Sequence, residues 1–107
     1  MIDRYNKLVR DKIPQIISKQ GGFPLTEQLI GESYAEALHS KLAEEVAEYF
    51  ESRSIEELAD IVEVIYALVK QRGLSIKDLE SARLKKYDDA GGFENGIFLV
   101  EVRRGLD

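Results

Sequence analysis

The sequence has no cysteine, one histidine and two prolines among its 107 residues. Without cysteine it has neither disulfide bonds nor thiolate ligands, and a single histidine, His39, cannot form an imidazole-rich zinc site. Any metal would therefore be bound by oxygen. No apolar run is long enough to cross a membrane, and residues 1–6 lack the apolar stretch of a signal peptide. We therefore expect a cytoplasmic protein without a membrane partner.

The chain also lacks an excess of basic residues. Fifteen lysines and arginines stand against 20 aspartates and glutamates, which gives a formal net charge of −5 at pH 7. This balance argues against a protein that holds the phosphate backbone of a nucleic-acid polymer. With 44% hydrophobic residues, we expect a single domain over residues 1–107. Its core is small enough that a second copy, in a homodimer or homotetramer, is expected to complete it.

Capping signals and apolar periodicity predict an all-α fold, a bundle of four to five helices. Asp11 is expected to cap the first helix, while the other helices begin with capping-box patterns at Ser33, Ser54 and Ser75. Only a two-residue turn separates the second and third helices, so they should form an antiparallel hairpin. The predicted helices cover residues 11–20, 33–52, 54–72 and 75–88, and a short extended segment, as a strand or hairpin, is expected at residues 97–102.

Acidic residues gather in the predicted hairpin. Between residues 44 and 63 eight residues are acidic and one is basic. Two solvated helix faces would explain an ordinary cluster of this kind. At about 100° per residue, however, Glu45 lies within the apolar arc of its helix. A glutamate in such surroundings should be protonated or paired, and Lys41, one turn before it, can supply the partner.

The two helices of the hairpin carry similar patterns. Glu48 lies one turn after Glu45, at the edge of the same face. In the next helix Asp60 belongs to a second apolar strip opposite the main stripe, so this helix is expected to be buried on two sides, and Glu57 lies one turn before Asp60. Four carboxylates that face one another repel strongly, and a hard divalent cation is the usual remedy. The spacing therefore predicts a Mg²⁺ or Mn²⁺ site at Glu45, Glu48, Glu57 and Asp60.

Each of these acids also has a simpler explanation. Glu57 occupies the N3 position of the Ser54 capping box, Glu48 can pair with a basic residue on the surface, and Asp60 can cap a helix or pair with a neighbour. Glu44 lies outside the apolar arc, where it is either solvated or the catalytic base that activates water.

The hairpin carries two motifs, Glu44-Glu45-Val-Ala-Glu48 and Glu57-Leu-Ala-Asp60. They resemble the EExxE and ExxD motifs of the all-α nucleoside triphosphate pyrophosphohydrolases, the MazG-like superfamily. Residues 5–14 and 91–99 resemble the opening and closing segments of small members often named phosphoribosyl-ATP pyrophosphohydrolase-like. The resemblance implies hydrolysis of a nucleoside triphosphate between the α and β phosphates, with Mg²⁺ bound by Glu45, Glu48, Glu57 and Asp60.

A nucleotide substrate also needs basic side chains around its phosphates. The sequence has no glycine-rich phosphate-binding loop, so phosphate binding has to depend on metals and side chains. Two other functions stay open: action on phosphoribosyl-ATP itself, or a non-catalytic helical interaction module in which the acids are surface charge. The candidate phosphate-binding residues are Lys7, Arg10 and Lys12 near the start of the chain and Arg83 and Lys86 late in the fourth helix, where basic residues also complement the helix dipole.

Overall fold

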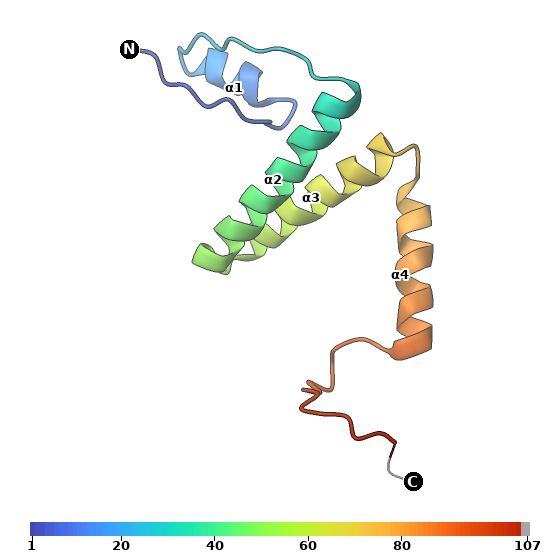
Figure 1. Ribbon diagram of the computed structural model, residues 1–107. Coiled ribbons are helices and arrows are strands. Elements are labelled where there is room, and N and C mark those ends of the chain that lie inside the picture. The colour runs from blue at the N-terminus through green and yellow to red at the C-terminus, as the bar shows by residue number, and fades with distance from the viewer. Residues whose placement is uncertain (106–107) are drawn as a thin grey trace. The chain divides into compact units, whose positions relative to one another are not determined.

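The computed structural model describes residues 1–105 and contains four helices, α1 (Ile13–Lys19), α2 (Gly31–Ser52), α3 (Ile55–Gln71) and α4 (Ile76–Ala90) (Figure 1). The described residues include no strand, so the predicted all-α class with four helices is confirmed. Residues 97–102 have neither helix nor strand, and the expected strand or hairpin there is wrong. A strand needs a partner for its backbone hydrogen bonds, and none of the described residues supplies one.

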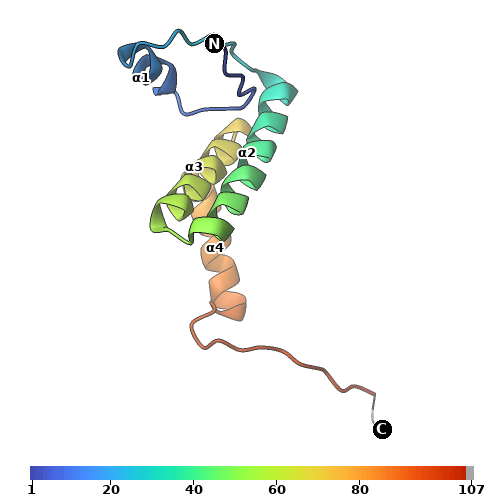
Figure 2. The ribbon, with the colours of Figure 1, turned by 90° about the vertical axis from the view of Figure 1, so that its left-hand side faces the viewer.

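The chain divides into two compact units, Met1–Ser75 and a second unit that begins at Ile76. Within the first unit α2 and α3 pack against each other as an antiparallel pair, whereas α1 packs against neither helix (Figures 1 and 2). The second unit holds α4 and the segment that follows it. None of the described helices is long and apolar enough to span a membrane.

The turn between α2 and α3 follows from its two residues. Arg53 has a φ of 56° and its backbone N–H donates to the Tyr49 carbonyl at 2.7 Å, which ends α2. Ser54 has extended backbone angles, and its hydroxyl oxygen accepts a hydrogen bond from the backbone N–H of Glu57 at 3.3 Å. This is the N-cap that the sequence predicts for the third helix. The short turn fixes the register of the hairpin, which places residues around 45 beside residues around 60.

The start of α1 differs from the sequence prediction. Asp11 does not cap it, because the helix begins at Ile13 with Lys12 in the N-cap position and no side-chain cap. A side chain at residue 11 would need free N–H groups two and three residues later. The N–H of Ile13 already donates to the Arg10 carbonyl at 3.0 Å, and Pro14 has no N–H to offer.

The start of α2 differs as well. The helix begins at Gly31, two residues before the expected cap at Ser33. The Ser33 hydroxyl lies inside the first turn and donates to the Ile30 carbonyl at 3.0 Å, so it does not cap the helix. Gly31 has a φ of +59°, a left-handed conformation that glycine adopts without steric cost.

The core of the first unit lies between α2 and α3. Leu38 is 2% exposed and Val64 is 8% exposed, and they are the only buried apolar side chains among the described residues. Val64 belongs to the second apolar strip of α3, so this strip faces α2. The main stripe of α3 is only partly covered, with Ile55, Leu58 and Val62 exposed. The expectation that α3 is buried on two sides is therefore met on one side only within the described chain.

Candidate metal centre

Glu45 is the one buried charged residue among those that the structure describes. It is 6% exposed and lies on the face of α2 that packs against α3. Lys41 Nζ lies 3.3 Å from Glu45 Oε1, which confirms the pairing expected from the sequence. Glu45 Oε2, in contrast, is buried and has no hydrogen-bond partner among the described residues. A buried polar atom without a hydrogen-bond partner lowers the stability of the fold by on the order of 1–3 kcal/mol, and by more when it is charged. A ligand bound to Glu45 Oε2 would offset this cost.

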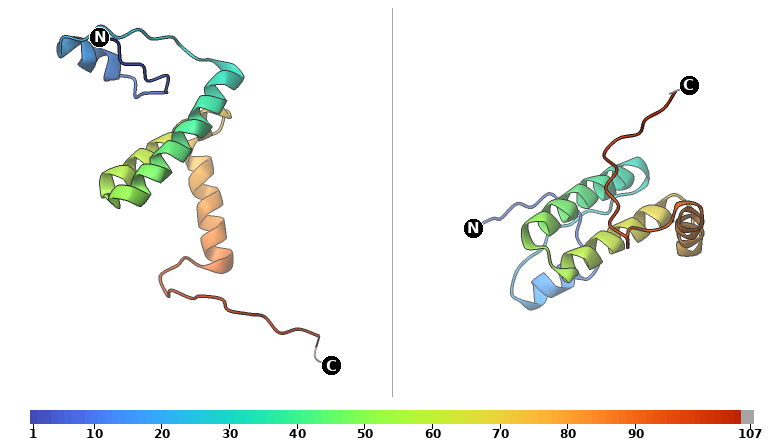
Figure 3. Two further views of the ribbon diagram at one scale, coloured as in Figure 1. Left: turned by 60° about the vertical axis from the view of Figure 1, so that its left-hand side comes forward. Right: turned by 90° about the horizontal axis from the view of Figure 1, so that it is seen from below.

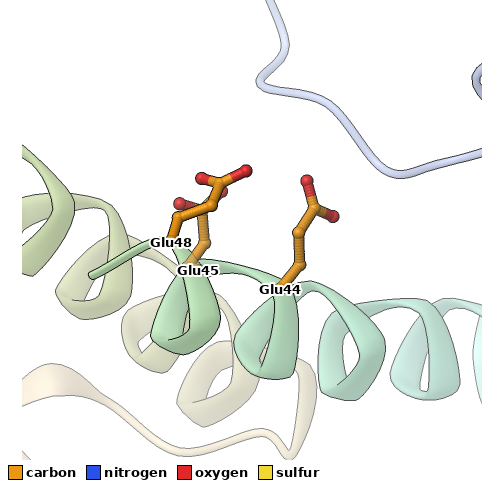
Figure 4. A group of neighbouring side chains, drawn as sticks. All are labelled: Glu44, Glu45 and Glu48. Carbon is orange, nitrogen blue, oxygen red and sulfur yellow. The ribbon is translucent and has the colours of Figure 1, made fainter. Parts of the chain in front are cut away.

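Four other carboxylates converge on Glu45 from both helices of the hairpin. In one group Glu44, Glu45 and Glu48, all from α2, each offer an oxygen within 4.8 Å of the others. Figure 4 shows the carboxylates of Glu45 and Glu48 close together, with Glu44 directed to the same side of the helix. In a second group Glu45 meets Glu57 and Asp60 from α3 within the same distance. Glu45 belongs to both groups and is therefore the centre of the arrangement.

The carboxylate of Glu57 is not used by the capping box. The backbone N–H of Ser54, which a full capping box would pair with that carboxylate, donates instead to Ser52 Oγ at 3.3 Å. Glu57 Oε2 is buried and, like Glu45 Oε2, has no hydrogen-bond partner among the described residues. The cap therefore positions the backbone of Glu57 and leaves its side chain available to a cation.

Three basic side chains pair with the cluster. Lys7 and Lys41 approach Glu44 Oε1 with their Nζ atoms at 3.5 and 3.3 Å, so Glu44 is half-buried and paired where the sequence suggested a solvated side chain. Arg10 Nη2 lies 2.6 Å from Asp60 Oδ1, so Asp60 forms an ion pair, although its partner is distant in the sequence and not the neighbour considered there.

The ion pairs leave the cluster with an excess of negative charge. Five carboxylates stand against three cations, so two negative charges lack a partner within the cluster. This excess equals the charge of one divalent cation. All the available ligand atoms are carboxylate oxygens, which suit Mg²⁺ or Mn²⁺. The donor set and the two unpartnered buried oxygens therefore fit the predicted ion.

The crowding of acids changes their protonation. The negative charge of Glu45 is the main cause that raises the pKa of Glu48 above the usual glutamate value. Loss of hydration, followed by the charge of Glu48, raises the pKa of Glu57. Burial lowers the pKa of Lys41, but its hydrogen bonds to Glu45 and Glu44 outweigh this effect and raise the pKa overall. Without a cation, the cluster thus makes Glu48 and Glu57 hold their protons to a higher pH than an ordinary glutamate does.

These shifts predict that the stability of the protein depends on pH when a chelator keeps metal ions away from the cluster. A glutamate with a raised pKa in the folded state stabilises the fold at low pH. That contribution is lost as the pH rises from the usual value of 4.5 through the raised value. We expect the variant Glu57→Gln, which cannot lose a proton, to gain stability relative to the wild type between pH 4 and pH 7. Urea unfolding in EDTA at several pH values measures the difference.

The variant Glu36→Gln is the control for this measurement, because Glu36 is an exposed glutamate on α2 outside the cluster. Its difference from the wild type should stay constant over the same pH range. A constant difference for Glu57→Gln as well would mean that crowding does not affect the titration of Glu57.

A cavity of about 260 Å³ adjoins the cluster. Residues 8–11 line it on one side, and residues of α2 and α3 line it on the other. Two of its lining residues, Glu45 and Asp60, also belong to the carboxylate cluster. The residues that line it are Leu8, Val9, Arg10, Asp11, Tyr34, Leu38, Lys41, Glu45, Asp60, Glu63, Val64 and Ala67.

The other candidate phosphate-binding residues are Lys12, Arg83 and Lys86. Lys12 occupies the N-cap position of α1, where its carbonyl accepts a hydrogen bond from the Ile16 N–H at 3.0 Å. Arg83 and Lys86 belong to α4 in the second unit, and Arg83 forms an ion pair with Glu80. Their roles in phosphate binding stay predictions.

Two features of the site were not predicted from the sequence. Glu63 lines the cavity, and its position one turn after Asp60 could have indicated this. The pairing of Arg10 with Asp60 joins residues that are 50 positions apart, and no local pattern indicates it.

No protein-family model, curated protein or solved structure matches the chain. The resemblance to the MazG-like superfamily therefore stays a prediction that depends on the two motifs and their surroundings.

Proposed function

We propose that this protein is a nucleoside triphosphate pyrophosphohydrolase that requires Mg²⁺ or Mn²⁺ and cleaves its substrate between the α and β phosphates. The observation that carries the proposal is the buried oxygen of Glu45, which lacks a partner and lies within 4.8 Å of acids from both helices of the hairpin. Folding brings these like charges together at a cost in free energy. A divalent cation is the ligand that offsets that cost.

The residues of the cluster take distinct roles in this proposal. The cation would be held by Glu45, Glu48, Glu57 and Asp60, and when bound it supplies Lewis acidity and neutralises charge on the polyphosphate. Glu44 is the candidate base for the attacking water, because it lies beside this group on α2. Its ion pairs with Lys7 and Lys41 hold its carboxylate on the side of the cluster.

The N-terminal segment contributes the phosphate-binding groups in this proposal. Lys7 and Arg10 already lie at the cluster through Glu44 and Asp60. A guanidinium and an ammonium group at that place suit a polyphosphate bridged to acids through a cation. Lys12 follows in the same segment and is the third candidate.

The MazG-like arrangement of the helices, a homodimer or homotetramer, and a cytoplasmic location belong to the same proposal. Support for the oligomer comes from α3. Ile55 is 72% exposed, and Leu58 and Val62 on the same stripe are 39% and 43% exposed. Apolar side chains gathered on one helix face are typical of a surface that packs against another chain.

The same apolar stripe favours the second candidate function, a non-catalytic helical interaction module. In that case the acids serve only as surface charge and the stripe of Ile55, Leu58 and Val62 is the functional surface. The two functions differ in their response to divalent cations. Only the pyrophosphohydrolase proposal predicts turnover of a nucleotide that requires Mg²⁺.

The proposed function is tested with a panel of ribonucleoside and deoxyribonucleoside triphosphates and phosphoribosyl-ATP in the presence of Mg²⁺. Pyrophosphate and orthophosphate are measured separately. We expect pyrophosphate and a monophosphate product from at least one member of the panel, and no turnover in EDTA. Release of orthophosphate alone would rule out cleavage between the α and β phosphates, and turnover of phosphoribosyl-ATP alone would select the alternative substrate. No turnover of any member would favour the interaction module.

A further inference from the structure

The N-terminal segment lies against the carboxylate cluster within the first unit. Residues 8–11 form one wall of the cavity whose other walls belong to α2 and α3. Figure 3 shows this segment passing beside the two helices before the chain enters α1. It makes two ion pairs with the cluster, Lys7 with Glu44 and Arg10 with Asp60.

The Arg10 guanidinium is bound to one of the carboxylates that would hold the cation. It lies 2.6 Å from a carboxylate oxygen of Asp60, which belongs to the group that offers ligand atoms together with Glu45 and Glu57. Its hydrogen bond to Asp60, aided by the charges of Asp60, Glu63 and Glu45, raises the pKa of the guanidinium. Arg10 therefore keeps its positive charge beside the cluster. A divalent cation at Asp60 would meet this like charge at close range.

The ion pair between Arg10 and Asp60 is open to water. The Arg10 side chain is 54% exposed, and the Asp60 side chain is 36% exposed, so water can replace the contact. The backbone of Arg10 is held separately, because its carbonyl accepts the Ile13 N–H at the start of α1. An exchange of partners by the side chain thus leaves this backbone hydrogen bond in place.

We propose that Arg10 is an exchangeable counter-ion: it neutralises Asp60 while the site has no cation, and when a divalent cation binds it leaves Asp60 and binds a phosphate group of the substrate. This inference rests on the proposed function, because it assumes the cation site. It adds an order of events, in which cation binding makes the guanidinium available. A guanidinium that is no longer paired with a carboxylate can bind a phosphate with two parallel hydrogen bonds.

A purely structural ion pair gives a different expectation. If Arg10 only fastens the N-terminal segment and stays on Asp60, its removal takes a like charge away from the cation but leaves the binding of the phosphate chain unchanged. If Arg10 is an exchangeable counter-ion, its removal has effects of opposite sign on two ligands. The cation binds more tightly because its competitor is gone, and the phosphate chain binds less tightly because its partner is gone.

The experiment is calorimetric titration of the full chain and its variants with two probes: Mn²⁺ alone, and inorganic tripolyphosphate at saturating Mn²⁺. We expect Arg10→Gln to bind Mn²⁺ about 5-fold to 10-fold more tightly than the wild type and tripolyphosphate about tenfold less tightly. Arg10→Lys keeps a positive charge that competes with the cation, but it lacks the planar guanidinium that binds a phosphate with two parallel hydrogen bonds. It should bind Mn²⁺ as the wild type does and tripolyphosphate less tightly.

The control is Arg103→Gln, which removes a positive charge that pairs with Glu101 in the second unit. It should change neither affinity. If Arg10→Gln binds Mn²⁺ as weakly as the wild type or more weakly, the exchange is overturned while the cation site stands. If the wild type binds no Mn²⁺, the proposed function fails first, so the two failures are distinguishable.

A measurement on the wild type covers the case in which Arg10→Gln does not fold. The Nε–H signal of Arg10 in a nitrogen-15 correlation spectrum is assigned by its absence from Arg10→Lys. Addition of Mg²⁺ should shift this signal as the guanidinium leaves Asp60. A signal that stays in place at saturating Mg²⁺ would overturn the exchange.

Discussion

Replacing Glu45 with glutamine is expected to lower the Mg²⁺-dependent release of pyrophosphate at least about 100-fold. The amide keeps the size of the side chain and removes the negative charge at the point where the two groups of carboxylates meet. The amide also puts an NH₂ group, which binds no cation, where the wild type has a carboxylate oxygen. One oxygen of Glu45 pairs with Lys41, and the other is the oxygen without a partner. The change in kcat/KM for the best nucleotide of the panel measures the effect.

Glu36→Gln is the matched control, because it makes the same chemical change on an exposed position of the same helix. Its activity should equal that of the wild type. Circular dichroism in EDTA checks that Glu45→Gln folds. If the folded variant keeps most of its activity, the cation does not depend on Glu45 and the proposed site is wrong.

Replacing Leu38 with alanine is expected to destabilise the protein by about 3 kcal/mol. Leu38 is 2% exposed and is one of only two buried apolar side chains in the described part of the chain. The α2–α3 pair depends on this small core, so a cavity in it removes a large share of a total stability of about 5–15 kcal/mol. The melting temperature should fall on the order of 10–20 °C.

Leu84→Ala tests whether this loss reflects burial. Leu84 lies on α4 and is 47% exposed, so its truncation should cost only about 0.5 kcal/mol. Both variants are compared at one protein concentration, because association with a second chain would make the melting temperature depend on it. Equal losses for Leu38→Ala and Leu84→Ala would contradict a core centred on α2 and α3.

Features set by neighbouring residues were predicted well from the sequence. The cap at Ser54 needs only a hydroxyl three residues before a free N–H, and the two-residue turn follows from it. The burial of Glu45 followed from the helical period, because its position lies among apolar ones on the face of α2. The convergence with Asp60 then followed from the register that the short turn imposes on the hairpin.

Features set by competition between groups were predicted less well. Asp11 and Ser33 both carry good capping groups, but the donors near Asp11 were already bonded or absent, and α2 began before Ser33. Periodicity showed that α3 has two apolar sides without showing which one faces α2. The approach of Arg10 to Asp60 depends on the path of the whole N-terminal segment, which no local pattern encodes.

The proposed function requires first of all that a divalent cation binds among the carboxylates around Glu45. Calorimetric titration of Mn²⁺ into the metal-free wild type and into Glu45→Gln tests it without the need for a known substrate. We predict saturable binding to the wild type and binding at least about tenfold weaker to Glu45→Gln. Equal affinities in the two proteins, or no binding to the wild type, would contradict a cation site at Glu45.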